Sequence, residues 1–306
     1  MTSSSANDVW AIGNLVNLGT GLASPLFEHW NGTAWTATTV ESNNEFLFGA
    51  SADAANDAWA VGFNGSDNIE TSAMHWDGTN WKSAATPNVG EGTNKLNAVL
   101  ALAPNDVWAV GFSTPVAPPK QAATQTLIEH FDGTSWAVVP SPNVGPNSAN
   151  QSNRLLGLTA NSANDIWAFG SYFAAHGSGH QMTLLLHWDG TSWTVASSPS
   201  PTKGEFPCDL LWTGVASSPG DVWILGSVHD GSLALHMTTG VDSSSSFVHF
   251  LIFDFLVMSE SSANLPLPDW GKVARHSGGL GKVGDFAIQR LESVESARNI
   301  IFPESD

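Results

Sequence analysis

One phrase occurs five times along this chain of 306 residues. Each copy has an aspartate in a short polar turn and a tryptophan two positions later; the aspartates are Asp8, Asp57, Asp106, Asp165 and Asp221. The aspartates of successive copies are 49, 49, 59 and 56 residues apart. A second repeated motif lies between the copies: a histidine followed in most units by an aromatic residue, Asn or Asp, and Gly. Its histidines are His29, His75, His130 and His187, with His236 as a degenerate fifth. A regular period of this length indicates one structural unit repeated five times.

The segment 153–199 shows what one unit predicts. Four short runs are rich in apolar, β-branched or aromatic residues, at 155–160, 166–170, 184–188 and 191–195, and turn residues separate them. Four antiparallel strands joined by turns make one blade of a β-propeller. We therefore predict an all-β propeller over residues 1–242, with blade units at about 1–40, 46–87, 96–142, 154–199 and 210–242. The first and last units are incomplete, because the first lacks an apolar innermost strand and the fifth degenerates after His236.

The residues after the fifth unit, 243–306, lack the repeat and hold five of the ten basic residues. The apolar run 247–258 predicts a strand that helps to close the array, and a loose amphipathic pattern predicts a short helix at 286–299. Propellers close by pairing strands from their two ends, which removes exposed sheet edges. The alternative is that these blades belong to an array of six or seven.

Composition excludes several classes of function. The formal net charge is −18, and residues 1–242 contain only five basic side chains, so the chain lacks the basic face that nucleic acids and anionic membranes require. The longest apolar run is about half the ~20 residues of a membrane-spanning helix, so no membrane insertion is expected. Residues 1–5 show no signal peptide. The single Cys208 rules out a disulfide framework or a cysteine-rich zinc site, and we expect no metal or other cofactor.

The order of motifs resembles the kelch repeat of the galactose-oxidase-type propellers. Residues 107–111 (Val-Trp-Ala-Val-Gly), 132–136 (Asp-Gly-Thr-Ser-Trp) and 140–142 (Pro-Ser-Pro) follow that order, although a single glycine stands where the kelch repeat has a pair. A second, looser resemblance is to the WD-repeat propellers, whose dipeptide appears as Trp76-Asp77 and Trp188-Asp189.

The kelch resemblance implies tests for enzymatic function. A radical copper site of the galactose-oxidase type needs several tyrosines, and this chain has only Tyr172. A sialidase-like site needs an arginine cluster, and residues 1–242 contain only Arg154. A glycan-active hydrolase with two carboxylates at the mouth of the central channel is an open alternative. The acidic residues outside the repeated turns are Asp53, Asp67, Glu70, Glu91, Glu129, Glu205 and Asp209.

The repeated residues themselves predict structure rather than chemistry. Each repeated aspartate stands alone in a tight turn, whereas calcium needs six to eight oxygen ligands in one place. One histidine per blade favours a structural hydrogen bond over a metal ring. The repeated tryptophans indicate packing between blades, so any ring that stacks on a sugar must come from outside the repeat.

Loop lengths point to one face of the propeller. The turns after the first and third strands are short and nearly constant, whereas the second-to-third loops and the blade connections vary; because a blade is antiparallel, both variable classes emerge on the same side. Function tends to lie on variable loops held by a rigid scaffold. The predicted ligand-binding residues are Arg154, Tyr172, His176 and His180, followed by Asp67, Asn68 and Lys120. His176 and His180 can be read as a two-histidine metal site, but an exposed glycine-rich loop is the preferred interpretation.

The leading hypothesis is a non-catalytic binding or scaffold propeller whose variable-loop face contacts a glycan or a protein. The hydrolase above is the first alternative, and a purely structural repeat protein at the cell surface is the second. The acidic, tryptophan-rich and cysteine-poor composition favours an exported bacterial protein at the cell surface or outside the cell.

Overall fold

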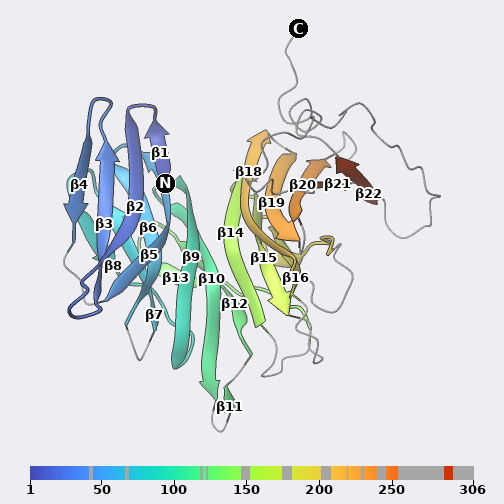
Figure 1. The fold of residues 1–306 in the computed structure, drawn as a ribbon, viewed down its shortest axis with the longest axis horizontal. Coiled ribbons are helices and arrows are strands. Elements are labelled where there is room, and N and C mark those ends of the chain that lie inside the picture. The colour runs from blue at the N-terminus through green and yellow to red at the C-terminus, as the bar shows by residue number, and fades with distance from the viewer. Residues whose placement is uncertain are drawn as a thin grey trace, which may run out of the picture.

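In the computed structural model each repeat unit folds into one antiparallel sheet (Figure 1). The structure describes residues 1–40, 44–65, 69–117, 120–121, 123–145, 152–173, 181–200, 208–218, 220–228, 231–239, 246–253 and 286–291. Its regular elements over these ranges are all strands.

The five sheets follow one another along the chain. The first blade comprises β1 (Thr2–Ser5), β2 (Asp8–Val16), β3 (Ala23–Trp30) and β4 (Trp35–Thr39). The second comprises β5 (Glu45–Ala54), β6 (Asp57–Asn64), β7 (Glu70–Trp76) and β8 (Trp81–Ala84). The third comprises β9 (Gly92–Ala103), β10 (Asp106–Ala117), β12 (Gln125–Phe131) and β13 (Trp136–Val138), with the short β11 (Lys120–Gln121) beside the end of β10. The fourth comprises β14 (Ser152–Ser162), β15 (Asp165–Phe173), β16 (Gln181–Trp188) and β17 (Trp193–Val195). The fifth comprises β18 (Leu210–Ser218), β19 (Asp221–Val228), β20 (Gly231–Thr239), β21 (Ser246–Phe253) and β22 (Phe286–Leu291).

The first strand of each blade lies innermost. β1 packs against β5, β5 against β9, β9 against β14, and β14 against β18, so the blades succeed one another around a common axis. Four-stranded antiparallel sheets in this arrangement form a β-propeller, which confirms the predicted fold class. Among the described residues, β1–β4 and β18–β22 share no interface of the kind that joins successive blades. The termini are therefore not joined by strand pairing within the part of the chain that the structure describes.

Two details differ from the sequence prediction. The first blade does have an innermost strand, β1, because the polar residues 2–5 pair their backbone with the edge of β2 even though they offer no apolar pattern. Residues 286–291 form strand β22 and not the start of a helix. They pair in parallel with β21, whose free edge offers hydrogen bonds that the weak helical pattern does not outweigh. β21 covers most of the segment 247–258 and adds a fourth strand to the fifth blade.

Tryptophan pairs hold neighbouring blades together. The tryptophan of a second strand meets the tryptophan of the next blade's fourth strand nearly at right angles in three pairs: Trp10–Trp81 (5.2 Å, 88°), Trp59–Trp136 (5.2 Å, 82°) and Trp108–Trp193 (5.7 Å, 74°). Edge-to-face rings add about 0.5–1.5 kcal/mol per pair to the stabilisation from burial. Trp35 occupies the same fourth-strand position in the first blade, but the described residues place no second-strand tryptophan of another blade against it, and it is 48% exposed.

A glycine within the second strand of the second to fifth blades permits a close approach of the inner strand. A Cβ built on Gly62, Gly111 or Gly170 would lie 1.8–2.0 Å from a carbonyl oxygen of the neighbouring inner strand, that of Phe46, Lys95 and Arg154 respectively. Only a residue without a Cβ lets the inner strand approach this closely. We call Gly62, Gly111, Gly170 and Gly226 the crossing glycines. This single glycine is therefore a packing requirement, and it sets the position of the inner-strand residue above it.

This close approach predicts a matched pair of variants. Gly170→Ala should lower the free energy of unfolding by about 1–3 kcal/mol, because the added methyl must displace the backbone of Arg154. Gly13→Ala, at the same repeat position in the first blade, should change it by less than about 1 kcal/mol, because nothing lies within 4 Å of the added carbon. Urea unfolding of both variants measures the difference. Equal losses would show that the glycine is not required for the crossing.

Candidate functional site

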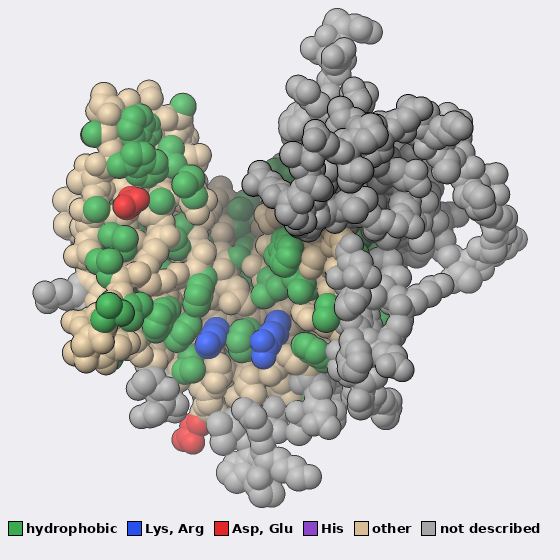
Figure 2. Space-filling model, viewed as in Figure 1, with side chains coloured by type: hydrophobic (Ala, Val, Ile, Leu, Met, Phe, Trp, Pro, Cys, Tyr) green, Lys and Arg blue, Asp and Glu red, His purple; other side chains and the backbone are tan. Residues whose placement is uncertain are grey.

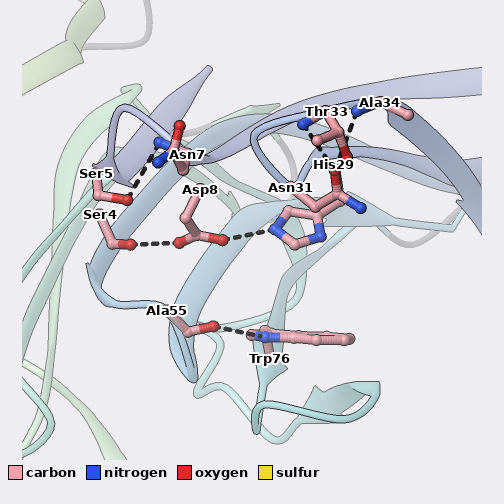
Figure 3. Close-up of polar contacts among 10 residues, drawn as sticks. All are labelled: Ser4, Ser5, Asn7, Asp8, His29, Asn31, Thr33, Ala34, Ala55 and Trp76. Carbon is pink, nitrogen blue, oxygen red and sulfur yellow. Dashed lines mark hydrogen bonds and ion pairs between the residues drawn. The ribbon is translucent and has the colours of Figure 1, made fainter.

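The repeated Asp, His and Trp residues form one structural unit per blade. The His Nε2 atom lies 2.5–2.8 Å from the Asp Oδ1 atom in all five blades, as in the Asp8–His29 pair of Figure 3. The imidazole also lies over the ring of the repeated tryptophan, with centroids 4.0–4.4 Å apart. Each histidine thus cross-links the second and third strands of its own blade, as predicted. The described residues contain no cluster of three or more His, Cys, Asp or Glu side chains that could hold a metal ion.

The repeated Asp-Gly turns are also structural. The Oδ1 atom of Asp189 accepts hydrogen bonds from the backbone N–H groups of Thr191 and Ser192, at 2.8 and 2.9 Å. Hydrogen bonds from Thr191 and from these N–H groups lower the pKa of Asp189 to about 2. Gly190 adopts a φ of +92°, which favours glycine. The constant face of the propeller is therefore built of turns that satisfy their own polar groups.

The predicted site residues fall into two groups. Asp67, Asn68, His176 and His180 lie outside the described residues, and Lys120 lies in β11 without a described side chain, so their roles stay predictions. Arg154 and Tyr172 lie on the paired strands β14 and β15, one register step apart. Arg154 is exposed, whereas Tyr172 is half-buried against the core shared by the third and fourth blades, and burial raises its pKa.

Arg154 lies close to the variable-loop end of its inner strand. Its repeat equivalents are Phe46 in β5, Lys95 in β9 and Leu210 in β18, as the crossing glycines show. Just beyond this position each of these four inner strands carries a β-bulge, which leaves Phe48, Asn97, Leu156 and Trp212 outside the ladder. A bulge re-aims a side chain, and bulges are frequent beside functional sites. Phe48 and Trp212 are each 52% exposed.

Aromatic rings and cations alternate across three blades at this level. Phe46 and Phe48 stack on Phe63 with centroids 5.1 and 5.6 Å apart. The Lys95 Nζ atom lies 4.0 Å from the Phe63 centroid, and the Arg154 Cζ atom lies 4.7 Å from the Phe112 centroid. We call Phe46, Phe48, Phe63, Lys95, Phe112 and Arg154 the inner band. Figure 2 shows Lys and Arg side chains near one another among hydrophobic side chains.

The inner band shows what the sequence prediction missed. The scarcity of arginine in the propeller region points to Arg154, but nothing in the composition points to its neighbours Lys95, Phe46 and Phe48. Aligning the blades on the glycine of each second strand would have placed Phe46, Lys95, Arg154 and Leu210 at one repeat position. A position that varies in chemistry between otherwise similar blades is the signal that could have found them.

Three of the described acidic side chains are buried, which removes them as candidates for an accessible catalytic pair. Glu129 in β12 is fully buried beside Thr71 of the second blade, and neither of its oxygens has a well-formed hydrogen bond. Glu45 is buried and accepts a hydrogen bond from Ser72, and Asp209 is fully buried. Asp67 and Glu205 lie outside the described residues. The hydrolase alternative thus rests on residues other than these three buried carboxylates.

Comparisons with known proteins add the following. No family model matches the chain, and no curated protein is significantly similar to it. Solved structures with a similar fold include YCF48 bound to a D1 peptide (14% identity, TM-score 0.44, covering 80% of this chain and 64% of that one). They also include the SapL1 lectin in complex with alpha-methyl fucoside (13%, 0.48, 82% and 76%) and an ancestral GH74 enzyme (11%, 0.47, 78% and 32%). The chain spans less than two thirds of YCF48. No helix within the described ranges is long and apolar enough to cross a bilayer.

Proposed function

We propose that this chain is a non-catalytic, kelch-like binding propeller that contacts a glycan or a protein on its variable-loop face, and that it works outside a bacterial cell. The observation that carries the proposal is the inner band. Its residues occupy positions where the repeat is not maintained. They include the half-exposed ring of Phe48 and the charges of Lys95 and Arg154, which form no ion pair within the described residues. Side chains that stay exposed or without an ion pair in the folded protein can contact a partner.

The geometry of the band supports contact with a ligand more than with the protein's own core. Repeated tryptophans such as Trp59 and Trp136 are 2% and 6% exposed and are fully used in blade packing. By contrast, Phe48 and Trp212 expose half of their surface from opposite sides of the band, on the second and fifth blades. Aromatic surface of this kind is enriched where proteins bind partners.

Arrays of glycans and of peptides, probed with the full chain, test this function. We expect a restricted set of bound members, and we expect Phe48→Ala to weaken binding roughly tenfold, since one lost ring contact is worth about 1–2 kcal/mol. Val138→Ala is the matched control, because Val138 is 40% exposed on the outer strand β13, away from the band.

Three results would contradict the proposal. The first is the absence of binding to any array member, and the second is binding that survives removal of both Phe48 and Trp212. The third is cleavage of a bound glycan by the chain, detected by mass spectrometry, which would favour the hydrolase.

A further inference from the structure

The two cations of the inner band are brought together by the repeat itself. Lys95 and Arg154 lie at the same repeat position on adjacent blades, each directly above the crossing glycine of its own blade. Because β9 packs against β14, the two positive side chains reach neighbouring places. They are two of only five basic residues among positions 1–242, in a chain whose formal net charge is −18. Two of the few positive charges of residues 1–242 therefore lie at one site.

Neither cation is neutralised within the described part of the chain. The ion pairs found there are the five Asp–His pairs and Lys82–Asp77, and none of them involves Lys95 or Arg154. Arg154 instead donates its Nε hydrogen to Ser152 Oγ at 3.1 Å. Burial, followed by the charge of Arg154, lowers the pKa of Lys95. Two like charges that raise each other's energy bind an anion more strongly than either would alone.

The rings around the cations offer faces on which a cyclic ligand can stack. The cations of Lys95 and Arg154 lie over the rings of Phe63 and Phe112, and these cation–π contacts fix the positions of both charges. Phe48 and Trp212 offer further half-exposed ring surface outside the repeat. The bulges at residues 97 and 156 interrupt the free edges of β9 and β14, which works against the addition of an extended peptide as an extra strand. Ring faces beside paired cations favour a saccharide over a peptide.

We propose that the inner band binds an acidic saccharide, with Lys95 and Arg154 contacting an oxyanion group on a sugar ring that stacks on the neighbouring aromatic side chains. This inference rests on the proposed binding function and names its ligand class. The oxyanion is a carboxylate or a sulfate ester, since both offer the oxygen acceptors that lysine and arginine recognise. Arginine can meet such a group with two parallel hydrogen bonds, whereas lysine acts as a point charge.

Isothermal titration of the full chain with matched oligosaccharides tests the proposal. The probes are an oligogalacturonate, the same oligosaccharide as its neutral methyl ester, a sulfated carrageenan oligosaccharide, its desulfated form, and an oligoglutamate peptide. We expect at least one charged saccharide to bind, and the methyl ester to bind at least about tenfold more weakly than the oligogalacturonate if the carboxylate is the recognised group. If the sulfate is the recognised group, the carrageenan oligosaccharide binds and its desulfated form does not.

Charge variants separate this inference from the proposed function. Lys95→Met, which keeps the apolar stem over Phe63, and Arg154→Gln should each weaken binding of the charged saccharide about tenfold or more. Lys82→Gln removes the same charge from an exposed outer strand and should leave binding unchanged. Near-ultraviolet circular dichroism checks that the variants keep the tryptophan packing.

The outcomes are distinct. If neutral and charged saccharides bind equally, or if the Lys95 and Arg154 variants bind as well as the parent, the acidic-saccharide inference is wrong while the binding function stands. Binding of oligoglutamate without any saccharide also overturns it, and assigns the band to an acidic peptide. If none of these probes binds, the acidic-saccharide inference fails, and the glycan and peptide arrays decide separately whether the binding function stands.

Discussion

Replacing Trp136 by alanine is expected to lower the free energy of unfolding by about 3–5 kcal/mol, the range typical of a large buried aromatic side chain. Trp136 is 6% exposed and meets Trp59 edge-on across the boundary between the second and third blades. Its removal leaves a cavity beside Phe131 and takes away one of the two ring contacts that Trp59 makes with the next blade, the other being with Phe131. Because blades are coupled mainly to their neighbours, the loss should affect the unfolding of both.

Trp35→Ala is the matched control, since Trp35 has the same position in the first blade. It is 48% exposed, and among the described residues its one tryptophan ring contact is with Trp30 of its own blade, at 5.9 Å, so we expect a loss below about 1 kcal/mol. The measurement is the midpoint and slope of urea unfolding, followed by tryptophan fluorescence and by far-ultraviolet circular dichroism. Similar losses for the two variants would mean that the right-angle tryptophan pairs do not hold the blades together.

The buried Glu129 is expected to make the protein less stable as the pH rises through neutrality. Burial raises the pKa of Glu129 from 4.5 to about 8, and the nearby Thr71 hydroxyl offsets only part of this shift. The folded state therefore retains a proton that the unfolded state has lost between these pH values. Its contribution to stability is favourable below about pH 4.5 and declines up to about pH 8. The full change is on the order of 5 kcal/mol.

Glu129→Leu tests this directly, because Leu186 and Leu235 occupy the same position in the fourth and fifth blades and are fully buried. The variant should be more stable than the parent at pH 8, and the difference between the two should shrink towards pH 5. Glu28→Leu is the control, since Glu28 has the same repeat position but is exposed in the first blade. A stability difference for Glu129→Leu that does not depend on pH between 5 and 8 would refute the account.

Much of the fold could be predicted because the same local sequence patterns occur five times along the chain. The Asn-Asp and Asp-Gly turns, the crossing glycine and the repeated tryptophan depend on backbone geometry and packing that recur in every blade. Within the helix expected at 286–299, residues 286–291 form a strand for the opposite reason, and residues 292–299 lie outside the described part of the chain. The helical pattern occurs once, and the edge of β21 provided a partner that no local pattern reveals.

The candidate site was only partly visible in the sequence. Arg154 could be found because arginine is scarce, but Lys95 lies 59 residues away in the sequence and meets Arg154 only because adjacent inner strands pack side by side. Phe48 and Trp212 look like ordinary strand residues until a bulge places them outside the ladder. The periodic pattern identifies residues that all blades share, whereas the candidate site consists of positions at which the blades carry different residues.

The repeat therefore predicts the blade: four strands, constant turns on one face, variable loops on the other, and tryptophans at the boundaries between blades. Which side chains remain exposed after folding depends on contacts between blades and is seen only in three dimensions. The reason is physical: turns and strand patterns follow from interactions between residues near in the chain, but exposure, burial and charge proximity arise between blades. Glu129 and Glu28 show this most simply, since one repeat position is enclosed in the third blade and open to solvent in the first.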